Sequence, residues 1–247
     1  MLGLFKKKSQ PIPIWFKTDI HNHVLPGIDD GSPDVETSIA LIEGLHRLGV
    51  DRIISSPHVA AVEFPNTPET LGAAYDELKK ALAEASITGP VSHSAEYRID
   101  EELSGIIEAG NLKPYPEDYL LIENQWLQEP WNLDEIIFQL QLKGYQPILA
   151  HPERFTYYHR DPGRLDDLHA KLPFQINLLS LAGFYGKPVQ KAAESLVKKG
   201  YCDFLGTDTH NLKHLEYLRA YLRTSEARRH RDMTLPTLKN DKIFASR

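Results

Sequence analysis

Residues 15–49, WFKTDIHNHVLPGIDDGSPDVETSIALIEGLHRLG, combine a short apolar run, a loop rich in histidine and aspartate, and an amphipathic stretch. The apolar run is predicted to form a strand and residues 33–48 to form a helix. Ser32 can cap this helix, Pro33 suits its first turn, and Gly49 ends it. A short buried strand followed by a helix is the repeating unit of a parallel sheet.

The same alternation of a short apolar run and a longer amphipathic stretch occurs seven times along the chain. Strands are expected at residues 15–20, 52–56, 91–95, 119–122, 147–150, 174–176 and 203–205. Helices are expected at residues 33–48, 68–85, 101–109, 133–143, 163–171, 187–199 and 214–222. This order predicts right-handed βαβ units and a parallel sheet. Because no glycine-rich dinucleotide loop follows the first strand, the sequence favours a (β/α) barrel over an open doubly wound sheet.

The composition is that of a folded globular protein. Of the 247 residues, 41% are hydrophobic and 25% are charged, so the chain can bury a sizeable core. We expect one domain over residues 1–247, with 1–14 as a flexible N-terminal segment and a peripheral basic tail after Ser225. The formal net charge of −6 argues against a nucleic-acid partner and against an anionic membrane surface.

The sequence predicts neither secretion nor a membrane span. No apolar run approaches the roughly 20 residues that a span needs, and the first residues do not have the pattern of a signal peptide. Cys202 is the single cysteine, so no intrachain disulfide is possible, which fits a reducing compartment. We therefore expect a cytoplasmic protein, and the sequence leaves its oligomeric state open.

Histidine and carboxylate side chains follow almost every predicted strand. These residues are His21, His23, Asp29, Asp30, His58, Glu96, Glu123, His151, Asp208 and His210, whereas the sixth strand ends at Asn177. The carboxyl ends of the strands of a parallel barrel meet on one face, so these side chains are expected to form one site. Imidazole and carboxylate together suit Zn²⁺, Mn²⁺ or Fe²⁺. Any one of them alone would fit a core histidine, a helix cap or an ion pair equally well.

Seven short motifs in this order resemble the PHP (polymerase and histidinol phosphatase) superfamily. They are DIHNH at 19–23, PGIDDG at 26–31, SPH at 56–58, EY at 96–97, LIE at 121–123, AHPER at 150–154 and TDTHN at 207–211. The resemblance covers residues 16–222 and is closest to the bacterial capsule-type metal-dependent protein-tyrosine phosphatases. It implies a single PHP-type domain, an α/β fold built as a distorted (β/α)7 TIM-like barrel.

The resemblance also implies three divalent metal ions, expected to be Mn²⁺, with Fe²⁺ or Zn²⁺ as alternatives. Carried over residue by residue, the first ion takes His21, His23, Glu96 and Asp208. The second takes Glu96, Glu123 and His151, and the third takes Asp30, His58 and His210. Asp30 matches the aspartate of the family better than Asp29 does.

The implied chemistry is attack of a metal-bound hydroxide on phosphorus, with Arg154 holding the phosphate oxygens. His210 is the catalytic residue we name as a general acid, and His214 is a second candidate. Relatives carry another arginine after the last motif, where this chain has none. Lys213, His214 or Arg98 replaces it, or the role is missing.

The expected substrate is phosphotyrosine on a protein, namely a bacterial tyrosine kinase of capsular or exopolysaccharide biosynthesis that would place the enzyme at the periphery of the inner membrane. A histidinol phosphatase or a nucleotide phosphoesterase of the same superfamily is the nearest alternative. A barrel hydrolase of amides and a non-catalytic module that binds metal or a partner are the others.

A cysteine-based phosphatase mechanism is disfavoured by the sequence. That mechanism needs an arginine six positions after the nucleophilic cysteine, whereas Asp208 stands there after Cys202.

Overall fold

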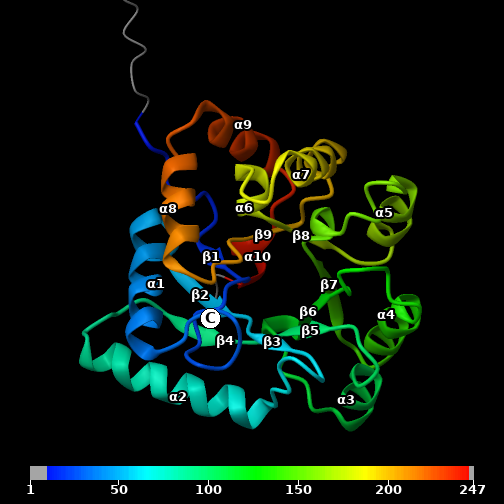
Figure 1. Ribbon diagram of the computed structural model, residues 1–247, viewed down its shortest axis with the longest axis horizontal. Coiled ribbons are helices and arrows are strands. Elements are labelled where there is room, and N and C mark those ends of the chain that lie inside the picture. Colours follow the sequence, from blue (N-terminus) through cyan, green and yellow to red (C-terminus); the bar gives the residue numbers. More distant parts are fainter. Residues whose placement is uncertain (1–9, 245–247) are drawn as a thin grey trace, which may run out of the picture.

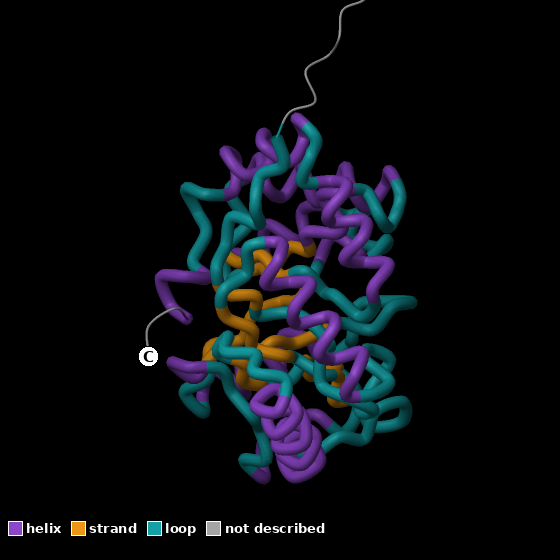
Figure 2. The backbone as a smooth tube through the Cα atoms, turned by 90° about the vertical axis from the view of Figure 1, so that its left-hand side faces the viewer, coloured by secondary structure: helices purple, strands orange, loops and turns teal. Residues whose placement is uncertain are grey.

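The computed structural model describes residues 10–244, in which helices surround centrally placed strands (Figure 1; Figure 2). The strands are β1 (Thr18–Asp19), β2 (Arg52–Ser55), β3 (His58–Val59), β4 (Val91–His93), β5 (Glu96–Arg98), β6 (Tyr119–Glu123), β7 (Gln146–Ala150), β8 (Phe174–Asn177) and β9 (Phe204–Gly206). The α-helices are α1 (Val35–Leu48), α2 (Pro68–Glu84), α3 (Leu103–Ala109), α4 (Leu133–Leu142), α5 (Pro162–His169), α6 (Leu178–Ala182), α7 (Lys187–Lys199), α8 (Leu212–Tyr221), α9 (Ser225–Thr234) and α10 (Asn240–Phe244). Two 3₁₀ turns are η1 (Pro116–Asp118) and η2 (Pro152–Arg154).

All pairs between these strands are parallel, as the alternation predicted. One sheet has the order β1-β2-β4 and the other has the order β3-β5-β6-β7-β8-β9. Each of the seven predicted strand–helix pairs is present within a few residues of its expected position. The protein is therefore a mixed α/β fold with parallel sheets.

A kink divides two of the predicted strands, which is why nine strands replace the expected seven. Pro57 has no N–H to donate to a ladder, and β2 stops before it while β3 begins after it. The neighbouring strand breaks at the same level, between β4 and β5. Hydrogen bonds from Ser94 N to Ser55 O (2.8 Å) and from Glu96 N to Pro57 O (2.9 Å) continue across the kink. The kink places His58 directly opposite Glu96.

The segments that follow β1 and β9 lie side by side. Asp208 N donates to His21 O (2.7 Å), and His23 N donates to Thr209 O (3.0 Å). Asn22 and Thr209 form an isolated parallel bridge. The HxH and DxH segments, although about 185 residues apart in the numbering, are thus adjacent through their backbones.

The start of α1 differs from its prediction. Asp34, rather than Ser32, caps the helix, because its carboxylate accepts the Thr37 N–H at 2.8 Å. The Ser32 hydroxyl instead donates to Asp34 O at 2.8 Å. Gly49 ends the helix as predicted, with a φ of 108° that suits glycine.

The expectation of a peripheral tail after Ser225 is wrong. Helix α10 contacts β1 and η1, and Phe244 is buried against aromatic side chains. Its ring lies 5.8 Å from Tyr115, 5.6 Å from Tyr119 and 5.6 Å from Phe204. These groups belong to a second apolar cluster with strand residues, namely Ile20, Ile54, Leu121, Ile148 and Ala150. The C-terminal segment therefore completes part of the core.

Of the segment predicted to be flexible, residues 1–9 lie outside the described part of the chain. The following residues are packed. Ile12 N donates to Leu222 O at 3.0 Å, Ile14 N donates to Leu48 O at 2.7 Å, and the Ile14 side chain is buried. Among residues 10–244, no helix has the length and apolar character needed to cross a membrane.

Asn240 offers a direct test of how α10 is attached. Its Nδ2 donates to Thr18 O (2.9 Å) and Leu205 O (2.7 Å), and its Oδ1 accepts from Leu205 N (2.9 Å). Asn240→Ala leaves these buried backbone groups unpaired, so we expect the free energy of unfolding to fall by at least about 2 kcal/mol in urea denaturation. The exposed neighbour Lys242 supplies the control, because Lys242→Ala should change stability by less than about 0.5 kcal/mol. Equal stability of the two variants would contradict this role.

Candidate metal centre

The nine side chains predicted to bind metal gather at the carboxyl ends of the strands. Four groups have ligand atoms that all lie within 4.8 Å of one another: His23, Asp30, His58 and His210; His21, His23 and Asp208; His21, Glu96 and His151; and His58, Glu96 and Glu123. Every predicted ligand belongs to at least one group. Most are buried, although Asp30 is exposed. The arrangement can hold more than one cation.

The Glu96 carboxylate occupies the middle of the cluster. Its Oε2 lies 3.2 Å from His21 Nε2 and 3.2 Å from His58 Nδ1, and its Oε1 lies 3.1 Å from His151 Nε2. Glu96 has no solvent exposure. One buried carboxylate thus faces three imidazoles, which suits a ligand shared between ions.

The two oxygens of Asp208 face different neighbours. Oδ1 points to imidazoles, at 3.4 Å from His21 Nε2, 3.5 Å from His23 Nε2 and 3.4 Å from His210 Nδ1. Oδ2 accepts hydrogen bonds from Asn177 Nδ2 (2.6 Å), Arg154 Nη1 (2.7 Å) and the Tyr185 hydroxyl (3.2 Å). Asp208 therefore joins the histidine cluster to Arg154.

Several imidazoles are oriented by residues that were not predicted as ligands. Asp29 Oδ2 lies 2.7 Å from His23 Nδ1 and also accepts the His58 N–H at 3.0 Å. Gln175 Oε1 lies 2.7 Å from His21 Nδ1. A partner on the far nitrogen fixes the ring orientation and the tautomer of a metal-binding histidine. Asp29 was visible in the sequence beside Asp30, whereas Gln175 gave no signal because it lies within a strand.

The cluster contains buried polar atoms without a hydrogen-bond partner among the described residues. They include His23 Nε2, His58 Nδ1 and Glu123 Oε1. Buried polar atoms are normally paired, so unpaired ones that converge on a small volume need an explanation. Nitrogen and carboxylate donors of this kind fit a divalent transition metal. The residues present therefore fit a metal site.

The buried carboxylates and imidazoles perturb one another. Burial and the nearby Glu96 carboxylate raise the pKa of Glu123 to about 8. Burial lowers the pKa of His21, but the Glu96 and Asp208 carboxylates outweigh it and raise that pKa to about 9. Both shifts keep protons on the metal-free cluster at neutral pH. Cation binding would displace these protons.

Two of the strand-end residues have a backbone conformation that is unusual without glycine. The φ angle is 31° at His151 and 52° at Asp208. Such conformations cost free energy and are found at functional sites, where the surrounding structure imposes them. Here His151 N donates to Gln175 O at 2.8 Å, which helps to hold the turn.

Arg154 lies beside the cluster between two aromatic rings. Its guanidinium carbon is 4.6 Å from the Trp126 ring centroid and 4.2 Å from that of Tyr185. The side chain is 19% exposed, so it is held in place and still reaches solvent. This is the placement expected of a group that holds a phosphate.

The three residues considered as a substitute for the second arginine occupy different places. Arg98 Nε donates to Glu123 Oε2 at 2.9 Å, so Arg98 borders the cluster. Lys213 is exposed at the start of α8. His214 is buried, with Nδ1 3.2 Å from Asp208 O. His210 lies in a ligand group, and its role as a general acid stays a prediction.

The surroundings of Cys202 do not suit a nucleophile. The side chain is fully buried, and burial raises the pKa of its thiol well above the usual value. The reactive form of a cysteine is the thiolate, which this environment disfavours. Cys202 thus acts as a small apolar residue.

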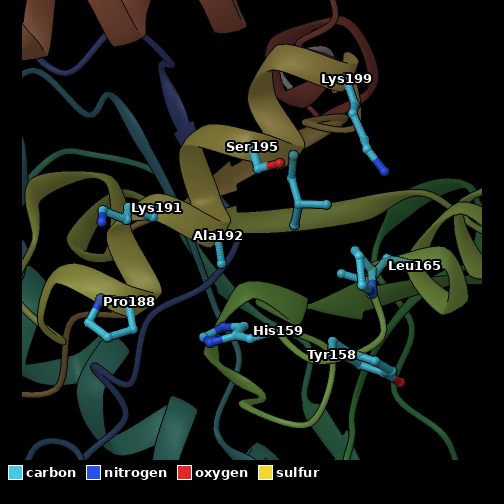
Figure 3. Close-up of a pocket in the computed structure, with 10 residues that line it drawn as sticks. Tyr158, His159, Leu165, Pro188, Lys191, Ala192, Ser195 and Lys199 are labelled. Atoms are coloured by element: carbon cyan, nitrogen blue, oxygen red, sulfur yellow. The ribbon is translucent and has the colours of Figure 1, made fainter.

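A separate groove of about 330 Å³ lies between α5 and α7 (Figure 3). Pro188, Lys191, Ala192, Ser195 and Lys199 line its α7 side. His159 lines the opposite side, with Nε2 2.7 Å from Glu153 O. None of the nine predicted ligands lines this groove.

Comparisons with known proteins agree with this geometry. Residues 17–224 match the family model described as capsular polysaccharide synthesis, CpsB/CapC. The tyrosine-protein phosphatase YwqE of Bacillus subtilis is 34% identical over 197 residues, which cover 79% of this chain and 78% of the relative. The putative tyrosine-protein phosphatase CapC of Staphylococcus aureus is 27% identical over 202 residues, 81% of this chain and 79% of the relative.

A solved structure is similar over most of the molecule. It comes from work on YwqE from Bacillus subtilis and CpsB from Streptococcus pneumoniae, described as unique metal-dependent tyrosine phosphatases. The TM-score is 0.74 at 30% identity, and the match covers 90% of this chain and 94% of that chain. The likeness therefore includes all of the strands that carry the cluster.

Gly206 tests how tightly the cluster is packed. A Cβ at this position would lie 2.4 Å from His21 Cβ and 2.9 Å from Gln175 Nε2, so His21 would have to shift. We expect Gly206→Ala to lower stability by about 1–3 kcal/mol and to reduce bound metal in elemental analysis. Gly72→Ala is the control, because no atom lies within 4 Å of the added Cβ in α2 and stability should rise by about 0.5–1 kcal/mol. Normal metal content in Gly206→Ala would show that His21 is not constrained in this way.

Glu153 should make the stability of the metal-free protein depend on pH. Burial raises its pKa from 4.5 to about 7. Between these values the folded chain holds a proton that the unfolded chain has lost, so stability falls as pH rises through this window, by about 3 kcal/mol in total. Glu153→Gln removes this contribution. Urea unfolding in the presence of a chelator should show the variant gaining on the wild type from pH 4.5 to pH 8, whereas parallel curves would refute the assignment.

Proposed function

The chain belongs to the capsular polysaccharide synthesis family CpsB/CapC, and from this premise we propose that it is a metal-dependent phosphatase that hydrolyses phosphotyrosine on proteins. The observation that carries the proposal is the buried cluster around Glu96, with its unpaired donor atoms beside Arg154. The matching relatives have tyrosine-protein phosphatase names, which favours phosphotyrosine over histidinol phosphate.

We propose that the two sheets form one distorted (β/α)7 barrel of the PHP type in a single domain. The hydrogen bonds that cross the kinks between the sheets support this arrangement. So do the backbone bonds that join the segments after β1 and β9. A barrel explains why residues from six predicted strand ends meet on one face.

We propose three divalent ions, with Mn²⁺ as the first choice and Fe²⁺ or Zn²⁺ as alternatives. One would be held by His21, His23, Glu96 and Asp208, a second by Glu96, Glu123 and His151, and a third by Asp30, His58 and His210. The observed groups also bring His23 close to the third set and His58 close to the second. Bound ions would supply Lewis acidity and a water that is acidic enough to act as a nucleophile near neutral pH.

The remaining chemistry belongs to side chains of the chain itself. Arg154 contacts Asp208 through Nη1, which leaves other N–H groups of its guanidinium for phosphate oxygens. Trp126 and Tyr185 restrict its movement, so little entropy is lost when phosphate binds. A phenolate leaves more easily than an alkoxide, so hydrolysis of phosphotyrosine needs a weaker general acid. We assign that role to His210.

We propose a bacterial tyrosine kinase of capsular or exopolysaccharide biosynthesis as the substrate protein. The family description and the names of the relatives support this choice. A cytoplasmic location at the periphery of the inner membrane follows from such a substrate and stays a prediction.

Metal dependence and cysteine independence are tested together. A chelator should abolish release of phosphate from a phosphotyrosyl peptide, and Mn²⁺ should restore it. Glu96→Gln should lower kcat by at least about a hundredfold and reduce bound metal, because the shared carboxylate is weakened as a ligand. Cys202→Ser is the matched control and should keep wild-type turnover. Turnover that resists the chelator, or that is lost in Cys202→Ser without loss of folding, would refute the mechanism.

A further inference from the structure

The loop between β6 and α4, residues 124–132, exposes large apolar side chains beside Arg154. Leu127 is 96% exposed, Trp131 is 90% exposed and Trp126 is 40% exposed. Exposed apolar groups that gather next to a site mark a contact surface for a ligand or a partner. Neither the phosphatase chemistry nor the packing of the core explains Leu127 and Trp131.

This loop is fixed at both ends, so its exposure is imposed by the structure. The Tyr157 hydroxyl donates to Gln125 O at 3.0 Å. Arg164 Nε donates to the two carboxylate oxygens of Glu129 at 3.0 and 3.1 Å, and Pro130 is buried. The anchored residues surround Leu127 and Trp131 and present them to solvent in a defined position. Such prior ordering lowers the entropic cost of binding.

The same loop contacts the residues of the candidate site. The Trp126 ring lies 4.6 Å from the Arg154 guanidinium and is stacked on His151 at 5.9 Å, with 13° between the rings. Leu127 is the next residue in the chain. A protein segment that brings a phosphate to Arg154 therefore comes within reach of the exposed side chains.

We propose that Leu127 and Trp131 bind apolar residues that flank the phosphotyrosine of the substrate protein. The proposal rests on the proposed function and names the class of sequence that the site prefers. An apolar residue on either side of the phosphotyrosine would cover Leu127 or Trp131 and remove apolar surface from water. The catalytic cluster itself is indifferent to these flanking residues, so selectivity comes from this loop.

The charges of the loop favour a protein contact over a membrane contact. Segments that bind anionic membranes combine apolar residues with lysine or arginine. Residues 124–132, NQWLQEPWN, contain no basic residue and one acidic residue, and the whole chain has a net charge of −6. The apolar side chains therefore face a partner that does not need positive charge.

The test compares two phosphotyrosyl peptides that differ only in the flanking residues, leucine in one and serine in the other. The Mn²⁺-loaded wild type should have the higher kcat/KM for the leucine peptide. In the double variant Leu127→Ser, Trp131→Ser, the ratio of the two kcat/KM values should fall on the order of tenfold. Leu142→Ser is the matched control, because Leu142 is 74% exposed at the far end of α4, about 15 Å along the helix, and should keep the wild-type ratio.

Turnover of p-nitrophenyl phosphate separates this inference from the proposed function. If the wild type hydrolyses that ester but treats both peptides alike, or if the double variant keeps the wild-type ratio, the docking role of the loop is refuted while the phosphatase assignment stands. If no phosphate ester is hydrolysed with Mn²⁺ present, both fail. Cosedimentation with phosphatidylglycerol vesicles that is lost in the double variant, with an unchanged peptide ratio, would overturn the inference in favour of a membrane contact.

Discussion

The burial of the Glu96 carboxylate is the constraint on which the site depends. A carboxylate with no solvent exposure is costly unless positive or hydrogen-bonding groups surround it. His21, His58 and His151 reach it from three different strand ends, so the strands must hold those ends within a few ångströms. The kink at Pro57 contributes directly, because it sets His58 opposite Glu96 in the register of β3 and β5. Fold and ligand cluster are therefore two aspects of the same arrangement.

The candidate ligands could be predicted because their positions follow a simple topological rule. Carboxyl ends of parallel strands converge, so a polar residue at each end needs no further information to be placed. The orienting residues do not follow this rule. Gln175 lies inside β8 and reaches back to His21, and nothing in a strand of alternating residues marks such a contact. Asp29 and Asp30 are adjacent in sequence, and only the structure separates a side chain with no exposure from one that is 59% exposed.

The same distinction applies to the fold. Long amphipathic segments such as α1 and α7 repeat often enough to be recognised from their periodicity. Helix α10 has five residues, too few to show a period, and its attachment depends on the hydrogen bonds of one amide, that of Asn240. The division of β2 from β3 was open to prediction from Pro57, since proline interrupts a ladder. The matching break between β4 and β5 was not, because Ser94 and Ala95 carry no such signal.

The cluster is also a source of instability in the metal-free chain. Glu96 and Glu123 are buried close together, and the backbone at His151 and Asp208 adopts a costly conformation. The apolar cluster that includes Phe204 and Phe244 offsets part of this cost, since it adds buried surface between the strands. Cation binding would relieve the remainder by displacing the protons held on Glu123 and His21 and by pairing the unpaired donors. Metal affinity and folding stability are therefore linked through the same carboxylates, and both must rise with pH as those protons are lost.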